Sequence, residues 1–448
     1  MCDNKKTRFF LLTILMAGSC FYTSAQTLNE QYGPKSTKES SPYSRFGIGN
    51  LNRSVNTLTR GFGGAATAYN DVYAVNSFNP ATYSFLKATT IDFAFEARSN
   101  SVVMNNKTYT SGTATLSYLN LGIPLGKYLG MDLGFKPISN MYYNSNDTTD
   151  AQNIGTAIYS YNGSGSLQYA YIGFSGNYKG LSIGFNGGYA FGTFNYANSF
   201  SALNSGTDQP SIRNVEFSYR DQVGGLYWKG GLLYRAALKK KHFLNIGATV
   251  TLSQQLHVKR NSYNISYQTE PNVDGTETAS NIDTVSSIIG KKGTLQMPFE
   301  SSFGISYGKG FHWNVGADFA YTDWSAFQKM GVRTGIADNS WRMSAGGEFT
   351  PNPEGGDKNY FSIITYRLGA YYGKDYLNVN NTDIDFIGGT LGASFPLKRN
   401  YNQFGRINTA LDIGKRGTIT NGLAREFFVK FTIGISLNDI WFIRPKYN

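Results

Sequence analysis

A two-residue alternation of apolar with small or polar residues begins at Thr89 and recurs through most of the remaining chain. In the last such segment, apolar side chains from Phe427 to Leu437 alternate with residues such as Lys430 and Gly434. Successive side chains of a strand point to opposite faces, so this pattern predicts strands with one apolar and one polar face. A soluble β-sandwich can show the same alternation, so the period alone leaves the fold class open.

About fourteen such runs follow one another, each of roughly 9 to 15 residues, which is long enough for a tilted strand to cross a bilayer. Connections after even-numbered runs are mostly short, whereas those after the third, fifth and seventh are long, the longest running from about His257 to Gln296. This asymmetry predicts an all-β fold, a transmembrane antiparallel β-barrel of about 14 strands. The runs start near Thr89, Tyr109, Tyr128, Gly163, Leu181, Val223, His242, Met297, His312, Ser340, Phe361, Phe386, Gly405 and Glu426.

The N-terminus, residues 1–25, is typical of a secretory signal peptide. Basic residues between Lys5 and Arg8 precede an apolar run, and small residues precede a cleavage site after Ala25. A lipoprotein signal cut before Cys20 is the alternative, although the residues before that cysteine fit the pattern poorly. Cleavage after Ala25 removes both Cys2 and Cys20, so the mature chain would have no disulfide and no thiol chemistry.

The composition is compatible with an exported membrane barrel. The formal net charge of +12 could suggest nucleic-acid binding, but an exported chain with dispersed Lys and Arg argues against it. After the signal peptide, no apolar run approaches the roughly 20 residues of a transmembrane helix. With 51 glycines, 15% aromatic residues and an export signal, the chain suits a membrane β-barrel.

Residues 60–86 lie just before the first strand pattern but cannot form a membrane strand themselves. Pro80 has no N–H to donate, so it interrupts a regular ladder, and nearby glycines allow close packing. A segment so poor in aliphatic residues does not fold alone, so we expect it to fill the barrel lumen as a hatch. The residues expected to form the hatch are Gly61, Gly63, Gly64, Asn79, Pro80 and Ala81.

The segments RGFGGAATAYND and NSFNPAT resemble the N-terminal hatch of the FadL/TodX family of outer-membrane transporters, which carries an Asn-Pro-Ala sequence. Residues 163–192, 296–327 and 425–447 fit the same family, so the resemblance spans most of residues 41–447. It implies a location in the outer membrane of a Gram-negative bacterium. With the residue patterns, it predicts a signal peptide (1–25), an N-terminal extension and hatch (26–88), an outer-membrane β-barrel (89–437) and a C-terminal extension (438–448).

The resemblance also implies a function. Members of this family passively take up hydrophobic small molecules, such as long-chain fatty acids or hydrocarbons, and release them laterally through the barrel wall. In the family the third strand is kinked and opens the wall, and Pro137 falls in the third strand here, where a proline interrupts the ladder. The implied partners are a hydrophobic ligand, outer-membrane lipids and lipopolysaccharide, whose polar leaflet hinders apolar solutes.

Charged residues on the predicted lumen face must pair or meet water inside a barrel. Two interpretations remain open: a salt-bridge network that holds the hatch, or a selectivity path. These residues are Asp92, Glu96, Asp132, Lys136, Asp318, Arg342, Glu348, Arg367, Asp412 and Lys430.

No catalytic site, metal site or cofactor site is predicted. The segment from Gly304 to Gly308 matches the hydrolase G-x-S-x-G pattern, but it lies within an alternating run and no strand-to-helix turn follows. The three histidines are scattered, without metal-ligand spacing. The chain is therefore predicted not to be an enzyme.

A second function remains open, that of a barrel subunit in an outer-membrane secretion or assembly machine, bound to partner subunits. The observation that favours it is the tail after Leu437, NDIWFIRPKYN, which continues past the expected end of the barrel. Such an extension could dock a partner.

Overall fold

The computed structural model describes residues 40–441 apart from residues 54, 105–106, 152–154, 203–212, 272–276, 356–358 and 399–402. All described residues belong to one unit, which runs from Lys38 to Asn448. The expected signal peptide, the N-terminal extension before Ser40 and the end of the C-terminal extension lie outside the described residues.

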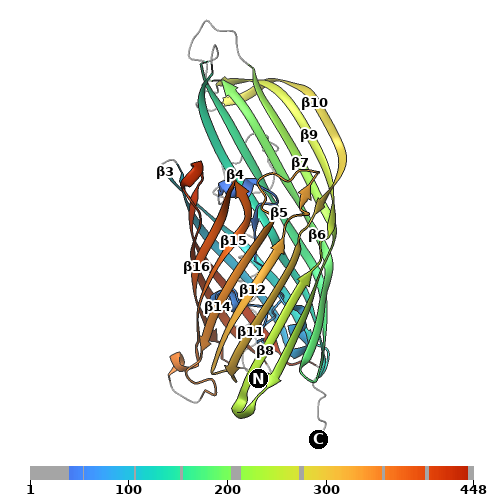
Figure 1. Ribbon diagram of the computed structural model, residues 1–448, viewed down its shortest axis with the longest axis vertical. Helices are drawn as coiled ribbons and strands as arrows, with labels where there is room; N and C mark the ends of the chain where they lie inside the picture. The colour runs from blue at the N-terminus through green and yellow to red at the C-terminus, as the bar shows by residue number, and fades with distance from the viewer. Residues whose placement is uncertain are drawn as a thin grey trace, which may run out of the picture. The chain divides into compact units, whose positions relative to one another are not determined.

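Fourteen strands of the described chain form a closed antiparallel barrel (Figure 1). The prediction of a 14-stranded barrel is therefore confirmed. The strands are β2 (Thr89–Met104), β3 (Lys107–Pro124), β4 (Leu129–Ala151), β5 (Gly155–Tyr178), β6 (Leu181–Ala202), β7 (Asn214–Ala237), β8 (His242–Thr251), β11 (Phe299–Lys309), β12 (Trp313–Asp323), β14 (Asn339–Phe349), β15 (Thr365–Val379), β16 (Thr382–Pro396), β17 (Gln403–Gly417) and β18 (Arg425–Asp439).

The first and last barrel strands close the wall. β18 pairs with β2 in register from Asp439 opposite Thr89 to Arg425 opposite Val103. Along β18, Leu437 is 45% exposed while the adjacent Ser436 is fully buried. An apolar outer face around a polar interior is the reverse of a soluble sandwich, so burial resolves the ambiguity that the period of two left open.

The two ends of the barrel differ. At the short-turn end, brief connections such as residues 125–128 and 179–180 join the strands, and Thr89 and Asp439 also lie there. At the long-hairpin end, β4 to β7 continue to lengths of 22 to 24 residues, longer than the predicted runs. Beyond the hydrocarbon neither strand face has to be apolar, so these extensions carry little alternation for a sequence pattern to detect.

The prediction of a long loop from about His257 to Gln296 is wrong. These residues mostly form a hairpin of β9 (Gln255–Pro271) and β10 (Glu277–Gln296). The lower part of β7, Gly230–Ala237, pairs with β8, whereas its upper part, Asn214–Gly224, pairs with β9. The hairpin therefore adds to the wall only at the long-hairpin end, above β8.

Short elements complete the described chain: η1 (Pro42–Arg45), β1 (Asn50–Leu51), α2 (Thr57–Gly61), η2 (Pro80–Phe85), η3 (Lys239–Lys241), β13 (Gln328–Lys329), η4 (Tyr360–Ile363) and η5 (Thr420–Gly422). Among the described residues, no helix has the length and apolar character needed to cross a membrane. The hatch has a small apolar core of its own, formed by Leu58, Phe62, Ala65, Tyr69 and Ala74.

Glycines let the hatch backbone touch the inner wall. Gly63 has a φ of +71° and donates its N–H to Thr390 Oγ1 at 2.9 Å. A Cβ on Gly369 of β15 would overlap the backbone of Gly63. A Cβ on Gly61 would come within 2.9 Å of the Gly392 Cα on β16. The hatch therefore packs directly against strand backbones, which only glycine permits at these points.

This packing predicts that Gly369→Val displaces the hatch. The added side chain should cost about 1–3 kcal/mol of overpacking and raise single-channel conductance in planar bilayers. Gly389→Val on β16 is the matched control, because the nearest atom to its Cβ is 3.9 Å away. Wild-type conductance of a folded Gly369→Val barrel would contradict the expectation that displacing the hatch alone opens the lumen.

Candidate functional site

The Asn79-Pro80-Ala81 sequence fixes the hatch to the wall at β6 and β7. The Asn79 side chain donates to Thr67 O at 2.7 Å and to Leu232 O at 3.0 Å, and accepts from the Ala81 N–H at 3.1 Å. Pro80 begins η2, where its missing N–H leaves no donor unsatisfied. The Asn79 side chain thus links hatch residue Thr67 to Leu232 of β7.

Several lumen charges contact the hatch directly. Asp318 accepts hydrogen bonds from the Ala66 N–H at 2.6 Å and the Thr67 N–H at 2.7 Å. Glu96 forms an ion pair with Arg60 of the hatch. These carboxylates accept hydrogen bonds from hatch N–H groups that are shielded from water. An apolar wall could not accept them.

Other charges reach the hatch through fewer contacts. Lys136 Nζ donates to Ser77 O at 3.0 Å, and Arg342 Nη2 donates to Gly63 O at 3.3 Å. Glu348 accepts from the Tyr69 hydroxyl at 2.8 Å and pairs with Arg367 at 2.9 Å. The wall and the hatch are therefore joined by charge-assisted hydrogen bonds on several strands.

The remaining predicted lumen charges contact wall residues. Asp132 accepts from the Tyr171 hydroxyl at 2.8 Å, and Asp92 accepts from the Tyr118 hydroxyl at 3.2 Å. Asp412 accepts from the Tyr371 hydroxyl at 2.6 Å and lies 3.7 Å from Lys430.

A second closure lies toward the long-hairpin end. Residues 324–338, the cap loop, fold inward after β12, and Trp324 and Phe327 are buried there. Lys329 of the cap loop lies 3.5 Å from Asp221, which Arg260 also binds at 2.6 Å. A buried carboxylate thus holds the cap loop to the wall.

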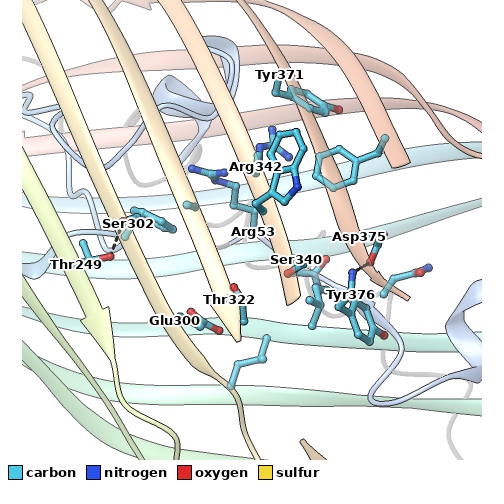
Figure 2. A pocket seen from close by; sticks show the side chains of 18 of the residues that line it. Arg53, Thr249, Glu300, Ser302, Thr322, Ser340, Arg342, Tyr371, Asp375 and Tyr376 are labelled. Carbon is cyan, nitrogen blue, oxygen red and sulfur yellow. Dashed lines mark hydrogen bonds between the residues drawn. The ribbon is translucent and has the colours of Figure 1, made fainter. Parts of the chain in front are cut away.

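Between the hatch, residues Asn50 to Asn52 and the wall lies a cavity of about 300 Å³. Figure 2 shows Arg53 and Arg342 side by side within it, with Tyr371 above them. Its lining holds two carboxylates, Glu300 and Asp375, against a larger set of basic side chains. The basic side chains are Arg53, Arg98, Lys136, Lys229, Arg342, Lys374, Arg416 and Lys430.

Three of these cations, Lys136, Lys229 and Arg342, have no carboxylate within ion-pair distance among the described residues. Lys229 lies 3.9 Å from the centre of the Phe78 ring, and Arg342 lies 3.7 Å from that of Tyr371. The Arg53 Nε has no hydrogen-bond partner within the described chain. Such a surplus of positive charge in a semi-enclosed space is suited to an anionic group.

The barrel ladder is interrupted beside this cavity. β3 pairs with β4 only from Leu119 opposite Phe135 to Pro124 opposite Gly130, although both strands continue toward the long-hairpin end. On β4, Phe135 is the last residue paired with β3 before Pro137, and Lys136 lies between them. The pairing of β4 with β5 shifts between Pro137 and Ser139. We call this interruption the seam.

Residues 40–52, the strap, occupy the β4 side of the seam. Asn50 and Leu51 pair with Asn140 and Ser139, and the Asn52 N–H donates to Ile138 O at 2.8 Å. Higher up, the Ser41 N–H donates to Tyr142 O at 3.1 Å. The strap thus replaces β3 as the partner of β4 above Pro137.

The G-x-S-x-G segment, Gly304–Gly308, lies inside β11, where Ser306 donates to Ala68 O at 3.1 Å. Its hydroxyl therefore contacts the hatch, and no strand-to-helix turn presents it as a nucleophile. Within the described ranges, no group of three or more His, Cys, Asp or Glu residues is placed to hold a metal ion.

Sequence reasoning missed Arg53, Lys229, the strap and the cap loop. For Lys229 a signal existed, because alternation from the outward Leu226 places Tyr227 and Lys229 on the lumen face. Arg53 and the strap had no comparable signal, since their positions depend on non-local pairing with β4.

The fold resembles those of solved transport channels. The P. putida toluene transporter TodX matches with a TM-score of 0.57 and 15% identity, covering 88% of this chain and 100% of that chain. A Pseudomonas aeruginosa FadL homologue matches with a TM-score of 0.54 and 12% identity, covering 87% and 98%. The CymD monoaromatic hydrocarbon channel matches with a TM-score of 0.51 and 14% identity, covering 86% and 98%. At these identities the likeness shows the fold.

A search of curated proteins found no match. A family model described as BamG matches residues 15–448, which is nearly the whole sequence. The expected resemblance to FadL and TodX is thus confirmed in the fold, while the matching family carries another name. The chain belongs to the BamG family, built on the barrel of the FadL and TodX channels.

Proposed function

We propose that the protein is an outer-membrane channel for hydrophobic small molecules that carry an anionic head group, such as long-chain fatty acids. The observation that carries this proposal is the seam between β3 and β4 directly beside a cation-lined cavity. Lys136 and Ile138, which flank Pro137, both line that cavity. The cavity therefore adjoins the one described stretch of wall where two neighbouring barrel strands separate.

The orientation follows from the two barrel ends. Short turns are typical of the periplasmic side and long hairpins of the outer surface. The ligand would enter past the cap loop, place its head group among Arg53, Lys229 and Arg342, and leave through the seam. Release into hydrocarbon suits an apolar tail, because it avoids an aqueous route.

The cationic lining favours a fatty acid over a neutral hydrocarbon. Lys136, Lys229 and Arg342 would gain charge-assisted bonds with a carboxylate but nothing comparable with an aromatic hydrocarbon. Both the hatch and the cap loop close the lumen, so passage requires the strap or cap loop to move. The strap is bonded to β4, and its buried Tyr43 and Ile48 belong to the same apolar cluster as Trp324 and Phe327 of the cap loop, so the two segments would move together.

Pro137→Val tests the lateral route. Valine supplies an N–H and favours regular pairing of β4, so it should narrow the seam and reduce labelled fatty-acid uptake in cells. The free energy of unfolding should change by less than about 1 kcal/mol. Uptake equal to wild type at equal surface level would contradict a gate at Pro137, and altered stability with normal uptake would assign the proline to hatch packing.

Lys136→Met combined with Lys229→Met tests the head-group site. Methionine keeps most of the side-chain volume but removes both charges, so fatty-acid binding should weaken roughly tenfold or more. Binding of toluene should change little, because it has no anionic group. The control is the pair Lys127→Met and Lys179→Met in exposed short turns. Equal losses for both ligands would contradict a charge-selective site.

A second candidate function is that of a barrel subunit in a larger outer-membrane machine. The β9–β10 hairpin favours it, because it raises one side of the wall without enclosing more lumen. Mild extraction of tagged protein from native membranes should then recover stoichiometric partners. Recovery of the chain alone, together with saturable fatty-acid uptake in cells, would contradict the subunit function and favour the channel function.

A further inference from the structure

β10 has an unpaired edge at the long-hairpin end. One side of the strand pairs with β9 along its length. On the other side, pairing within the described chain is confined to Leu295 and Gln296, which meet Lys329 and Gln328 of β13. Above them the Met330 N–H donates to Thr294 O at 2.9 Å, and from Ile282 to Gly293 no strand of the described chain pairs with this edge. The Gly290 N–H is bonded to Asn261 Oδ1 of β9 at 2.8 Å. Figure 1 shows β10 on the outer side of the arch that stands above β11 and β12.

This edge lies outside the bilayer in the proposed orientation. β11, β12 and β14 each contain 11 residues, which suffices for a membrane strand. β13 meets β10 just beyond the ends of β12 and β14, so residues before Leu295 stand farther out. Ile288 and Ile289 are 55% and 69% exposed there. In that orientation they face water rather than hydrocarbon, so the aliphatic side chains of a partner could cover them.

Three lysines next to this edge have no acidic partner. Lys292 lies directly opposite Lys259 on β9, and Lys291 is adjacent, all three being exposed. Two like charges facing each other across a ladder are destabilising. Elsewhere on the same hairpin cations are paired, as Arg260 is with Asp221 at 2.6 Å. No carboxylate lies within ion-pair distance of the three lysines among the described residues.

We propose that the edge of β10 between Ile288 and Gly293 docks a short extended segment of a partner protein, carrying acidic and aliphatic side chains. An added strand would satisfy the open N–H and C=O groups, as β13 does at Leu295 and Gln296. Its acidic side chains would lie near Lys292 and Lys259 on one face of the ladder and near Lys291 on the other face. The proposal rests on the machine-subunit candidate and is independent of uptake.

Two features shape the docked strand. The pairing of β10 with β9 shifts between Ile288 and Lys291, so Ile289 protrudes beside the ladder as an apolar contact. A second copy does not fit, because copies in one membrane share an orientation, and two β10 edges would run in the same direction. An antiparallel addition like that of β13 therefore requires a different protein.

Photo-crosslinking in native outer membranes tests this surface. p-Benzoylphenylalanine placed at Ile289 or Lys291 of the full-length chain should give an adduct with one defined peptide of another protein. Moving the probe from Ile289 to Lys291 should move the adduct toward the N-terminus of that peptide, as antiparallel pairing requires. The control position is Tyr263, which is 39% exposed on β9 but lies away from the edge.

Charge reversal provides the second arm. Lys291→Glu with Lys292→Glu should lower adduct yield roughly tenfold, because like charges would then meet, while Lys→Arg at both positions preserves it. Adducts with lipopolysaccharide, with a second copy, or with no peptide would overturn the proposal. Partners that still co-purify with the Glu variants at wild-type levels would place the interface elsewhere and leave the subunit role intact.

Discussion

The main-chain hydrogen-bond ladder of the wall is the constraint on which the structure depends. In hydrocarbon no water can satisfy a free N–H or C=O, so a membrane sheet must close on itself. The register runs from strand to strand and closes where β18 meets β2. The ladder is cut short between β3 and β4, and there the strap supplies the missing partner for β4. The wall is therefore completed by the strap at this point, which is where the proposed lateral exit lies.

The polar interior follows from the same constraint. The outer faces of the strands are apolar, so the inner faces carry the polar and charged residues. These become the surface on which the hatch folds. The apolar core of the hatch is small, and its N–H groups are satisfied by wall residues such as Asp318. The hatch is therefore held in its fold by contacts with the inner wall of the barrel. The positive charge left over after these contacts collects around the cavity, next to the seam.

The two-residue period of the sequence was sufficient to predict the barrel. Strands at Thr89, Leu181 and His242 begin where the two-residue period begins, because lipid on one face imposes that period. The β9–β10 hairpin extends the wall beyond β8, and its sequence lacks the period, so the pattern predicts a loop there. For the site, alternation can assign Asp318 or Lys229 to the lumen face. It cannot bring Arg53 to Arg342 or the strap to β4, since those contacts join distant parts of the chain and depend on the closed barrel.

The central claim is that an anionic amphiphile passes from the cation-lined cavity to the seam. A crystal structure with a fatty acid brominated near the end of its chain tests it most directly. The account predicts a carboxylate among Arg53, Lys229 and Arg342, and anomalous bromine signal at the seam beside Ile138. Bromine found only on the lipid-facing wall, with the cavity unchanged at saturating ligand, would contradict it.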